Sequence, residues 1–302
     1  MVCPRRDSGS DEAGAKKGSF ANDVQKIQSK PTAWGAALTL KKLTEPEPRQ
    51  KTMMPSYENS PLRQVTGDTL RPGGTRLTLR GIGLCEFRTG ARLLDIGCGA
   101  GASLCLLREM QFSALGIDIS PALLGESCEY SPVARADMEF LPFRDACLDG
   151  ILCECTLSLA DDPAAVLDEC RRTLVSGGRL LLSDLVQRGP SSRRLAPSPE
   201  AGKDSLFLSV PCAQGALPVD ELAQLIRERG FRVLHVEDHT RLLKELAVQI
   251  IWQFGSLAAF SELWRKNSEN TPHLEPCACA PGDNPGKHLG YALVIAEKKE
   301  NS

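Results

Sequence analysis

Short apolar runs alternate with amphipathic segments along most of the chain after about residue 90. Runs rich in Leu and Ile and bounded by Gly or Asp are typical of strands buried on both faces of a parallel sheet. The pattern predicts strands over residues 92–97, 113–118, 132–136, 148–154, 178–184, 231–237 and 289–297. Helical spacing predicts helices over residues 75–87, 103–110, 163–175, 219–229 and 241–265, the last as one long helix. We therefore expect an α/β domain with helices on both faces of its sheet.

The chain outside this pattern divides by composition. Residues 1–54 are rich in Ser, Lys, Gly and Pro and have little to bury, so we expect a disordered N-terminal extension. Residues 55–90 are expected to form a helical cap before the main domain at residues 91–302. Within that domain, residues 185–216 break the alternation and predict a lid loop. Residues 266–288 contain Pro and Cys and predict a linker.

Composition and charge limit the classes of partner. The 302 residues carry 36 basic and 38 acidic side chains, which gives a formal net charge of −2. Without a strongly positive field we expect no nucleic-acid partner, and without a long apolar run we expect no membrane partner. The first residues lack the apolar segment of a secretory signal, so we expect a cytoplasmic protein. Its 12 cysteines are then expected to be free thiols, used for packing, catalysis or soft-ion binding.

A glycine-rich turn, DIGCGAG, follows the first predicted strand and begins at Asp95. Glycines allow a ligand to approach the backbone closely, and the N-terminus of the next helix offers unpaired N–H groups. The spacing also fits the turn of a dinucleotide-binding oxidoreductase. Acidic residues after the next two strands, Asp118 and Asp137, suit a ribose diol and an adenine edge, and therefore favour a nucleoside cofactor.

These segments resemble the class I S-adenosylmethionine-dependent methyltransferases. LLDIGCGAG, GIDIS, ADMEFLPFRDACLDGILCE and RLLLSD follow that family's order and spacing over about residues 61–302. The resemblance implies a Rossmann-like, seven-stranded, mostly parallel sheet with an antiparallel last strand, S-adenosylmethionine as cofactor and a small-molecule substrate. It also implies the cofactor-binding residues Asp95, Gly97, Cys98, Gly99, Gly101, Asp118, Ile119, Asp137, Met138 and Glu154.

Each part of the cofactor has an implied partner in this resemblance. The turn from Asp95 to Gly101 is implied to hold the methionine part, and Asp118 the ribose hydroxyls. Ile119 and the pair 137–138 are implied to meet adenine. Glu154, at the end of the fourth strand, is implied to lie near the sulfonium.

Cysteines, and no histidine, occur at the end of the fourth predicted strand. Strand alternation places Cys153 and Cys155 on the same face, with Cys153 buried and Cys155 emerging where the strand ends. Methyl transfer is an in-line displacement that depends mostly on positioning. A thiolate or a trivalent metalloid needs little help from a general base, so these thiols are candidate acceptor-binding groups.

A more particular resemblance surrounds these thiols. ECTLSLADD, GGRLLLSDL and VPCAQGALPVDELAQLIRERGF are similar to segments of the bacterial and algal arsenite methyltransferases. That similarity implies that Cys155 and Cys212 bind trivalent arsenic and serve catalysis. The family's upstream cysteines have no counterpart except Cys85, and Cys277 or Cys279 could supply a third thiolate.

We therefore predict a methyltransferase of a small acceptor, with thiol-bound arsenite or a similar soft nucleophile as the leading candidate. The alternatives are methylation of an ordinary small metabolite, and a non-catalytic thiol module that binds a metal or metalloid on the same fold. A thiol or redox partner and the oligomeric state stay open. We expect the aromatic residues 252, 254, 260 and 264 in the core or on a dimer face. We expect Cys105, Cys128, Cys147 and Cys170 as buried packing residues.

Overall fold

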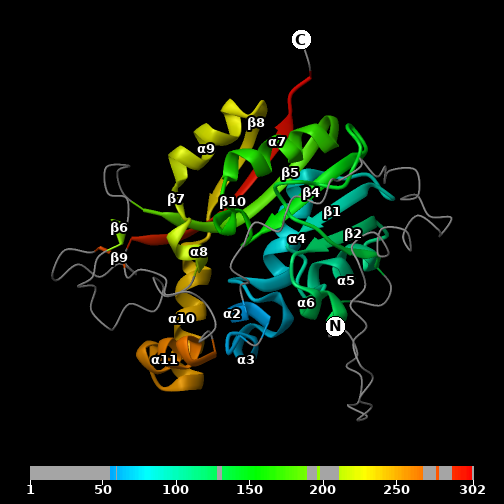
Figure 1. Cartoon of the computed structure of the whole chain (residues 1–302). Coiled ribbons are helices and arrows are strands. Elements are labelled where there is room, and N and C mark those ends of the chain that lie inside the picture. Colours follow the sequence, from blue (N-terminus) through cyan, green and yellow to red (C-terminus); the bar gives the residue numbers. More distant parts are fainter. Residues whose placement is uncertain are drawn as a thin grey trace, which may run out of the picture.

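A single mixed β-sheet forms the centre of the computed structural model, which describes residues 55–58, 60–127, 131–188, 196–197, 211–267, 277–278 and 288–300. The strand order is β3-β2-β1-β4-β5-β10-β8, and the short β7 pairs with the end of β5 (Figure 1). The strands are β1 (Arg92–Ile96), β2 (Ser113–Asp118), β3 (Val133–Arg135), β4 (Leu148–Glu154), β5 (Leu174–Gln187), β7 (Leu217–Pro218), β8 (Phe231–Asp238) and β10 (Leu289–Lys298). Two-residue strands β6 (Ala196–Pro197) and β9 (Cys277–Ala278) form a separate antiparallel pair.

The direction of each strand agrees with the expected class I topology. Strands β1 to β5 pair in parallel, whereas β10 runs antiparallel to both β5 and β8. The seven predicted strands are confirmed, and β7 adds an eighth that is too short to show in the hydrophobic pattern. Because the parallel strands end at one edge, the loops after β1, β2 and β4 meet there.

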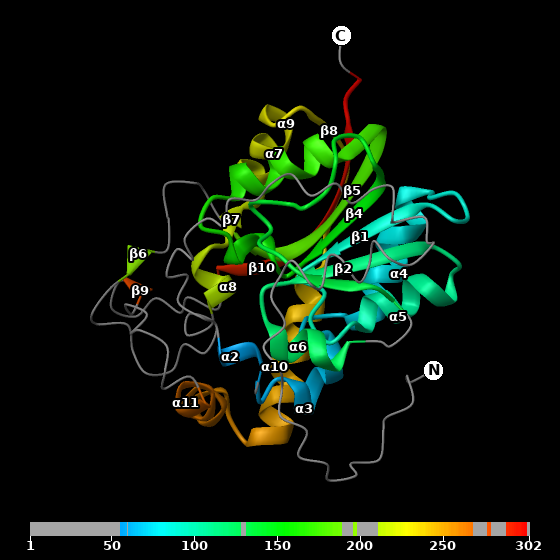
Figure 2. The same cartoon turned by 45° about the vertical axis from the view of Figure 1, so that its right-hand side comes forward.

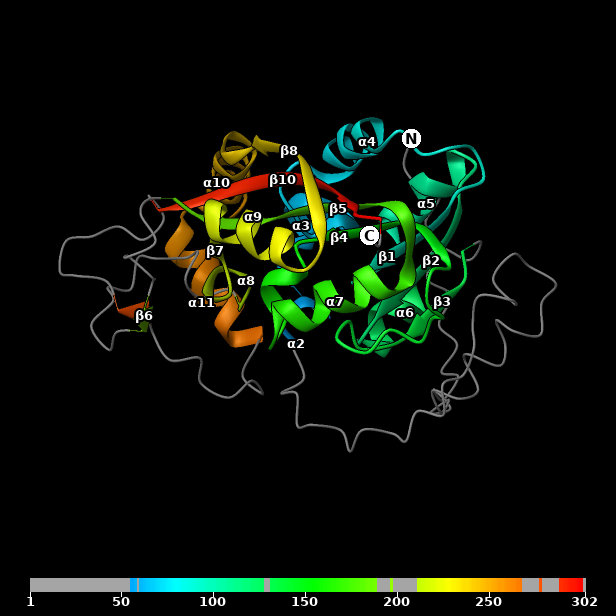
Figure 3. The same ribbon diagram turned by 90° about the horizontal axis from the view of Figure 1, so that it is seen from above.

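Helices cover both faces of this sheet. They are α2 (Pro55–Glu58), α3 (Arg63–Thr66), α4 (Gly74–Cys85), α5 (Ala102–Glu109), α6 (Pro121–Glu126), α7 (Pro163–Thr173), α8 (Pro211–Gln214), α9 (Val219–Glu228), α10 (Thr240–Phe254) and α11 (Leu257–Asn267). Seen from above, α7 and α9 lie on one side of the sheet, and α4 and α10 lie on the other (Figure 3).

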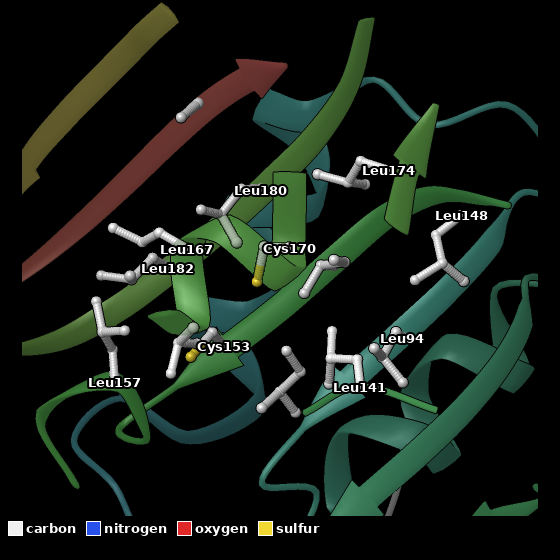
Figure 4. Close-up of a cluster of buried hydrophobic side chains, with 14 of the residues drawn as sticks. Leu94, Leu141, Leu148, Cys153, Leu157, Leu167, Cys170, Leu174, Leu180 and Leu182 are labelled. Carbon is white, nitrogen blue, oxygen red and sulfur yellow. The ribbon is translucent and has the colours of Figure 1, made fainter. Parts of the chain in front are cut away.

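Alternating strand residues enter two separate cores. Leu94 faces the core under α7 and α9, whereas its neighbour Leu93 faces the core under α4, α5 and α10. Figure 4 shows the first core, where leucines of the strands meet Leu167 and Cys170 of α7. Burial of strand residues on both faces explains why their sequences are continuous apolar runs.

The prediction of one long helix over residues 241–265 is wrong, because the structure contains two helices there. Helix α10 ends at Phe254, and α11 begins at Leu257 after a bend of 82°. Gly255 between them has φ +82°, a left-handed conformation that favours glycine. The bend folds α11 back, so that Phe260 and Trp264 pack against Leu246 and Ile250 of α10.

Trp252 is 90% exposed on α10, so of its two expected positions, the core or a dimer face, the core is excluded. Phe260 and Trp264 are buried in the core. Within the described residues, no single helix has the length and apolar character to cross a membrane. The bent pair α10 and α11 passes that test only when its two helices are taken together.

The segment predicted as a lid over residues 185–216 contains regular structure at both of its ends. Residues 185–187 continue β5 and pair with β10. Residues 211–214 form α8, which packs against the turn after β4. Residues 189–195 and 198–210 lie outside the described part of the chain.

Candidate active site

The glycine turn after β1 is held against two neighbouring strands. The amides of Gly97 and Cys98 donate hydrogen bonds to the carbonyl of Ile117, at 2.8 and 3.0 Å. Gly97 has φ +70°, and a Cβ at this position would collide with Thr156 in the loop after β4. Gly99 has φ +53°, and nothing lies within 4 Å of the position its Cβ would take. The turn is therefore fixed on one side and open for a ligand on the other.

Asp118 at the end of β2 lies directly beside this turn. Its Oδ2 accepts a hydrogen bond from the Gly99 amide at 2.9 Å, and its Oδ1 accepts one from the Ser120 amide at 2.9 Å. Burial raises the pKa of Asp118, and these two amide donors oppose that effect. The structure thus brings together two elements, the glycine turn and Asp118, that the sequence placed on different strands.

The remaining residues implied for adenine follow the ends of β2 and β3. Ile119, which follows Asp118, is exposed. The Ala136 amide donates to the Asp118 carbonyl at 3.1 Å, and this bond ties the loop after β3 to the end of β2. Asp137 accepts a hydrogen bond from the Glu139 amide at 3.0 Å, and Met138 packs against the core under α7.

A buried charged cluster lies on the other side of the turn. Asp95 is 3% exposed, Glu154 is 6% exposed, and Arg71, from the segment before α4, is 7% exposed. Nη2 of Arg71 lies 2.9 Å from Oε2 of Glu154. Hydroxyl groups of Thr78 and Ser103 each donate to Glu154 at 3.0 Å. Buried charges are tolerated when they are paired and hydrogen-bonded in this way.

Asp95 is the least satisfied acid of this cluster. Its Oδ2 atom is buried and has no hydrogen-bond partner. Burial and the charge of Glu154 raise the pKa of Asp95 to about 8, although Arg71 opposes both effects. A cationic group beside this carboxyl would favour its charged form.

Cys155 lies beside this cluster, but in an arrangement that strand alternation did not predict. Strand β4 ends at Glu154, and Cys155 has φ +53°, which turns the chain. Consequently Cys153 enters the core under α7, whereas Cys155 packs with the core on the opposite face of the sheet. The prediction that both thiols share one face is wrong. Sγ of Cys155 lies 3.2 Å from the hydroxyl of Tyr291 on β10.

The structure brings Cys212 of α8 close to Cys155. Burial raises the pKa of Cys155 well above its usual value; Asp184 and Cys212 add to this effect, and Tyr291 and Arg71 oppose it. Burial also raises the pKa of Cys212 to about 12, with the Tyr57 hydroxyl as its neighbour. Figure 2 shows α2, which carries Tyr57, next to α8. Both thiols are therefore protonated near neutral pH.

A close backbone contact positions α8. Gly215 follows the helix, and a Cβ there would collide with the carbonyl group of Ser158. Ser158 is itself anchored, because its amide and hydroxyl donate to Asp184 at 2.9 and 2.7 Å. Burial raises the pKa of Asp184 to about 6. The absence of a side chain at Gly215 therefore lets Cys212 approach the loop that carries Cys155.

Other cysteines named from the sequence lie elsewhere or outside the described residues. Cys85, the last residue of α4, is buried near Arg179 in the core under that helix. Cys277 lies in β9, paired with Pro197, and nothing further is described of its side chain. Cys128 and Cys279 lie outside the described residues. Cys147 and Cys170 are buried as expected, whereas Cys105 is only half-buried. Within the part of the chain that the structure describes, no group of three or more His, Cys, Asp or Glu side chains could hold a metal ion.

Sequence reasoning missed Arg71, Tyr57 and Tyr291. Arg71 precedes Pro-Gly-Gly at the start of α4, and Tyr291 lies within an apolar strand. Their partners are far along the chain, so no local spacing indicates their positions. Arg71 is one of several charged residues in the cap segment, so its charge gave no particular signal.

Comparison with known proteins agrees with this geometry. Residues 94–182 match the family model described as a methyltransferase domain. The O-methyltransferase resE of Aspergillus sclerotiorum is 30% identical over 243 residues, which cover 76% of this chain and 84% of that protein. An arsenite methyltransferase of Halobacterium salinarum is 30% identical over 161 residues, but these cover only 49% of this chain and 39% of that protein.

A solved structure shares the fold. Phosphoethanolamine N-methyltransferase 2 of Haemonchus contortus, in complex with S-adenosyl-L-methionine, superposes with a TM-score of 0.59 at 18% identity, covering 83% of this chain and 57% of that one. Together with the identity to resE over most of both chains, the glycine turn and the sheet order lead to one conclusion. The chain belongs to the class I S-adenosylmethionine-dependent methyltransferases, with S-adenosylmethionine as its cofactor.

Proposed function

We propose that this methyltransferase acts on a small molecule with a soft nucleophilic centre held between Cys155 and Cys212, and that trivalent arsenic bound by these thiols is the leading acceptor. The observation that carries the proposal is the position of the two thiols. They come from α8 and from the residue that follows Glu154, so they adjoin the charged cluster around Asp95. An acceptor held there would lie beside the site proposed for the cofactor.

The described residues fit the cofactor. The open face of Gly99 leaves room above the turn, and the unpartnered Oδ2 of Asp95 suits an ammonium group. We assign the turn from Asp95 to Gly101 to the methionine part and Asp118 to the ribose, with Ile119 and the pair 137–138 at adenine. Within the turn, the side chain of Cys98 packs beside Gly116, so Cys98 would contribute through its backbone.

The chemistry of the acceptor depends on its lone pair. When bound, S-adenosylmethionine supplies an electrophilic methyl group, and the bond that forms to the acceptor replaces the carbon–sulfur bond, whose electrons stay on sulfur. The protein's residues orient the reactants and exclude water. Because both thiols carry raised pKa values, each is protonated, and each arsenic–sulfur bond forms as the thiol proton and an arsenic-bound hydroxyl leave together as water.

Methylation of an oxygen atom in an ordinary metabolite is the second candidate. The similarity to resE, an O-methyltransferase, over 84% of that protein favours it. In this case Cys155 and Cys212 would only line the pocket. A non-catalytic thiol module is a weaker alternative, because such a module would have no use for the open glycine turn beside Asp118.

Methyl transfer from labelled S-adenosylmethionine to arsenite, with glutathione present, tests the proposal. We expect transfer by the wild type and none by Cys155→Ser or Cys212→Ser, although both variants should still bind the cofactor in calorimetry. Cys105→Ser, on the half-buried side of α5, is the matched control and should keep full activity. Full activity in both site variants, or none in a wild type that binds the cofactor, would overturn the metalloid proposal and leave O-methylation.

A further inference from the structure

Helix α10 has apolar side chains on its outer face as well as on the face that packs into the core. Leu243, Leu246 and Ile250 are buried on the inner face. On the outer face, Val248 is 65% exposed and Trp252 is 90% exposed. A surface helix usually carries polar residues on the face opposite the core, so a second apolar face indicates a second packing partner.

The exposed apolar side chains of this helix form one group, which we call the α10 patch and define as Val248, Ile251 and Trp252. Eight large apolar side chains are exposed among the described residues, and three of them belong to this short stretch of one helix. The other five lie singly on separate elements or loops. Single exposed apolar residues are normal, whereas a contiguous group marks an interaction surface.

The charges of α10 are unevenly distributed along the helix. Its charged residues are Arg241, Lys244 and Glu245, all in the first two turns. Nε of Arg241 pairs with Oε1 of Glu245 at 2.9 Å, so Lys244 leaves this half of the helix with a net positive charge. The last turn contains no basic residue, although the C-terminal end of a helix attracts cations. The two halves of α10 are therefore complementary to each other.

A two-fold axis at Val248 would bring these complementary halves together. Lys244, Val248 and Trp252 are four residues apart, so they form one row of side chains along the helix surface. When two such rows meet in antiparallel directions, each Lys244 faces the indole ring of the partner's Trp252, and the two Val248 side chains meet at the axis. An ammonium group over an indole ring is a favourable cation–π arrangement.

We propose that α10 is a homodimer interface, in which the α10 patch of one copy packs antiparallel against that of a second copy around a two-fold axis at Val248. Such a contact uses the same surface on both copies, so each favourable pair occurs twice. The inference goes beyond the proposed function and does not depend on which acceptor is methylated.

The surroundings of the α10 patch favour a second copy over a lipid surface. Helices that lie on membranes carry several Lys or Arg residues on their polar face. Gln249 and Gln253, which adjoin the patch, are uncharged, and the one positive charge of α10 that has no acidic neighbour to pair with on this helix is that of Lys244. An interface built from one helix per copy is small, so we expect reversible association at micromolar concentrations.

Sedimentation velocity of the full chain over a series of micromolar concentrations tests the interface. We expect a concentration-dependent dimer, and Val248→Glu should weaken association by at least about 100-fold, because two like charges would meet at the axis. Met110→Glu is the matched control, since Met110 is an exposed apolar residue at the end of α5, away from α10 (Figure 3). It should dimerise as the wild type does. Thermal unfolding followed by circular dichroism checks that both variants fold.

A charge exchange tests the antiparallel arrangement. Trp252→Lys should weaken association, because it places like charges opposite each other. Adding Lys244→Glu to this variant should tighten association by at least about 10-fold, since opposite charges then face each other twice across the interface. Positions 244 and 252 are about 12 Å apart along one helix, so this gain cannot arise within a single copy.

A wild type that stays monomeric over the whole concentration series would overturn the inference, and so would a dimer that Val248→Glu leaves intact. A double variant that associates no more tightly than Trp252→Lys would overturn the antiparallel arrangement. If a monomeric wild type binds vesicles of phosphatidylcholine and phosphatidylglycerol and Val248→Glu does not, the α10 patch is a lipid-binding surface and the homodimer is excluded.

Discussion

The hydroxyl of Tyr291 lies 3.2 Å from the thiol sulfur of Cys155, and it lies 3.2 Å from the hydroxyl of Ser183 as well. Tyr291 is fully buried on β10, so a strand near the end of the chain supports a thiol that follows β4. This contact links the antiparallel strand of the sheet to the candidate acceptor site. It also satisfies the tyrosine hydroxyl inside an apolar core.

Replacing Tyr291 with Phe should lower the free energy of unfolding by about 1 kcal/mol, because Ser183 and Cys155 lose a buried partner while the ring keeps its packing. Urea denaturation would measure the change. Because the hydroxyl opposes the rise in the pKa of Cys155, its removal should raise that pKa further. An unchanged stability would mean that water or another group replaces the hydroxyl.

Asp118→Ala should weaken binding of S-adenosylmethionine by about 1–3 kcal/mol, because the ribose hydroxyls lose a charged acceptor and the Gly99 amide loses its partner. Calorimetry measures this directly. Asp168→Ala, at an exposed position on α7, is the matched control and should bind the cofactor normally. Equal affinity in both variants would exclude Asp118 from the site.

The free energy of unfolding should fall as the pH rises through about 8, because of Asp95. Its pKa is about 8 in the folded protein, above its ordinary value of 3.8, so between these values the folded state binds a proton that the unfolded state does not. The stabilising contribution of Asp95 is fully present below pH 3.8 and is lost as the pH rises through about 8. Urea denaturation at about pH 6.5 and about pH 8.5 measures this fall in the free energy of unfolding. Both pH values lie above the range in which Asp184 contributes most to the pH dependence.

Asp95→Asn should flatten this dependence, since an amide does not titrate. Asp168→Asn should leave it as it is in the wild type. A slope that persists in Asp95→Asn would assign the effect to another group.

Affinity for a bidentate trivalent arsenical should stay nearly constant around neutral pH. Burial raises the pKa of both thiols, so they are protonated, and each arsenic–sulfur bond forms as a thiol proton and an arsenic-bound hydroxyl leave together as water. Titration with phenylarsine oxide at several pH values checks this. A rise in affinity of about 10-fold per pH unit would show that a thiol proton is released to solvent and would contradict this account.

Gly215→Ala should weaken phenylarsine oxide binding by at least about 10-fold, because the added methyl group collides with Ser158 and moves Cys212 away from Cys155. Gly83→Ala is a matched control, since nothing lies within 4 Å of its added methyl group on α4. It should leave arsenical binding intact and stabilise the protein by about 0.5–1 kcal/mol. Equal binding in the two variants would show that α8 tolerates the displacement.

Much of the fold follows from local pattern. Buried parallel strands require continuous apolar runs, and the turn at Asp95 requires glycines with positive φ. Both features can therefore be recognised in short stretches of sequence. The position of Asp118 at the end of β2 follows for the same reason. The fold class could therefore be predicted without coordinates, and the family resemblance implied the antiparallel last strand.

Tertiary structure alone decided the features that depend on distant or single-residue geometry. Arg71 meets Glu154 across 83 positions of sequence, and only packing of the cap against β4 brings them together. A positive φ at Cys155 reversed the face that alternation assigned to it, and Gly255 divided one apolar helical pattern into two helices. Periodicity reports the average repeat of a segment. It contains no information on one left-handed residue that redirects the chain, or on which buried charge finds its partner, because those depend on the free energy of the whole packed core.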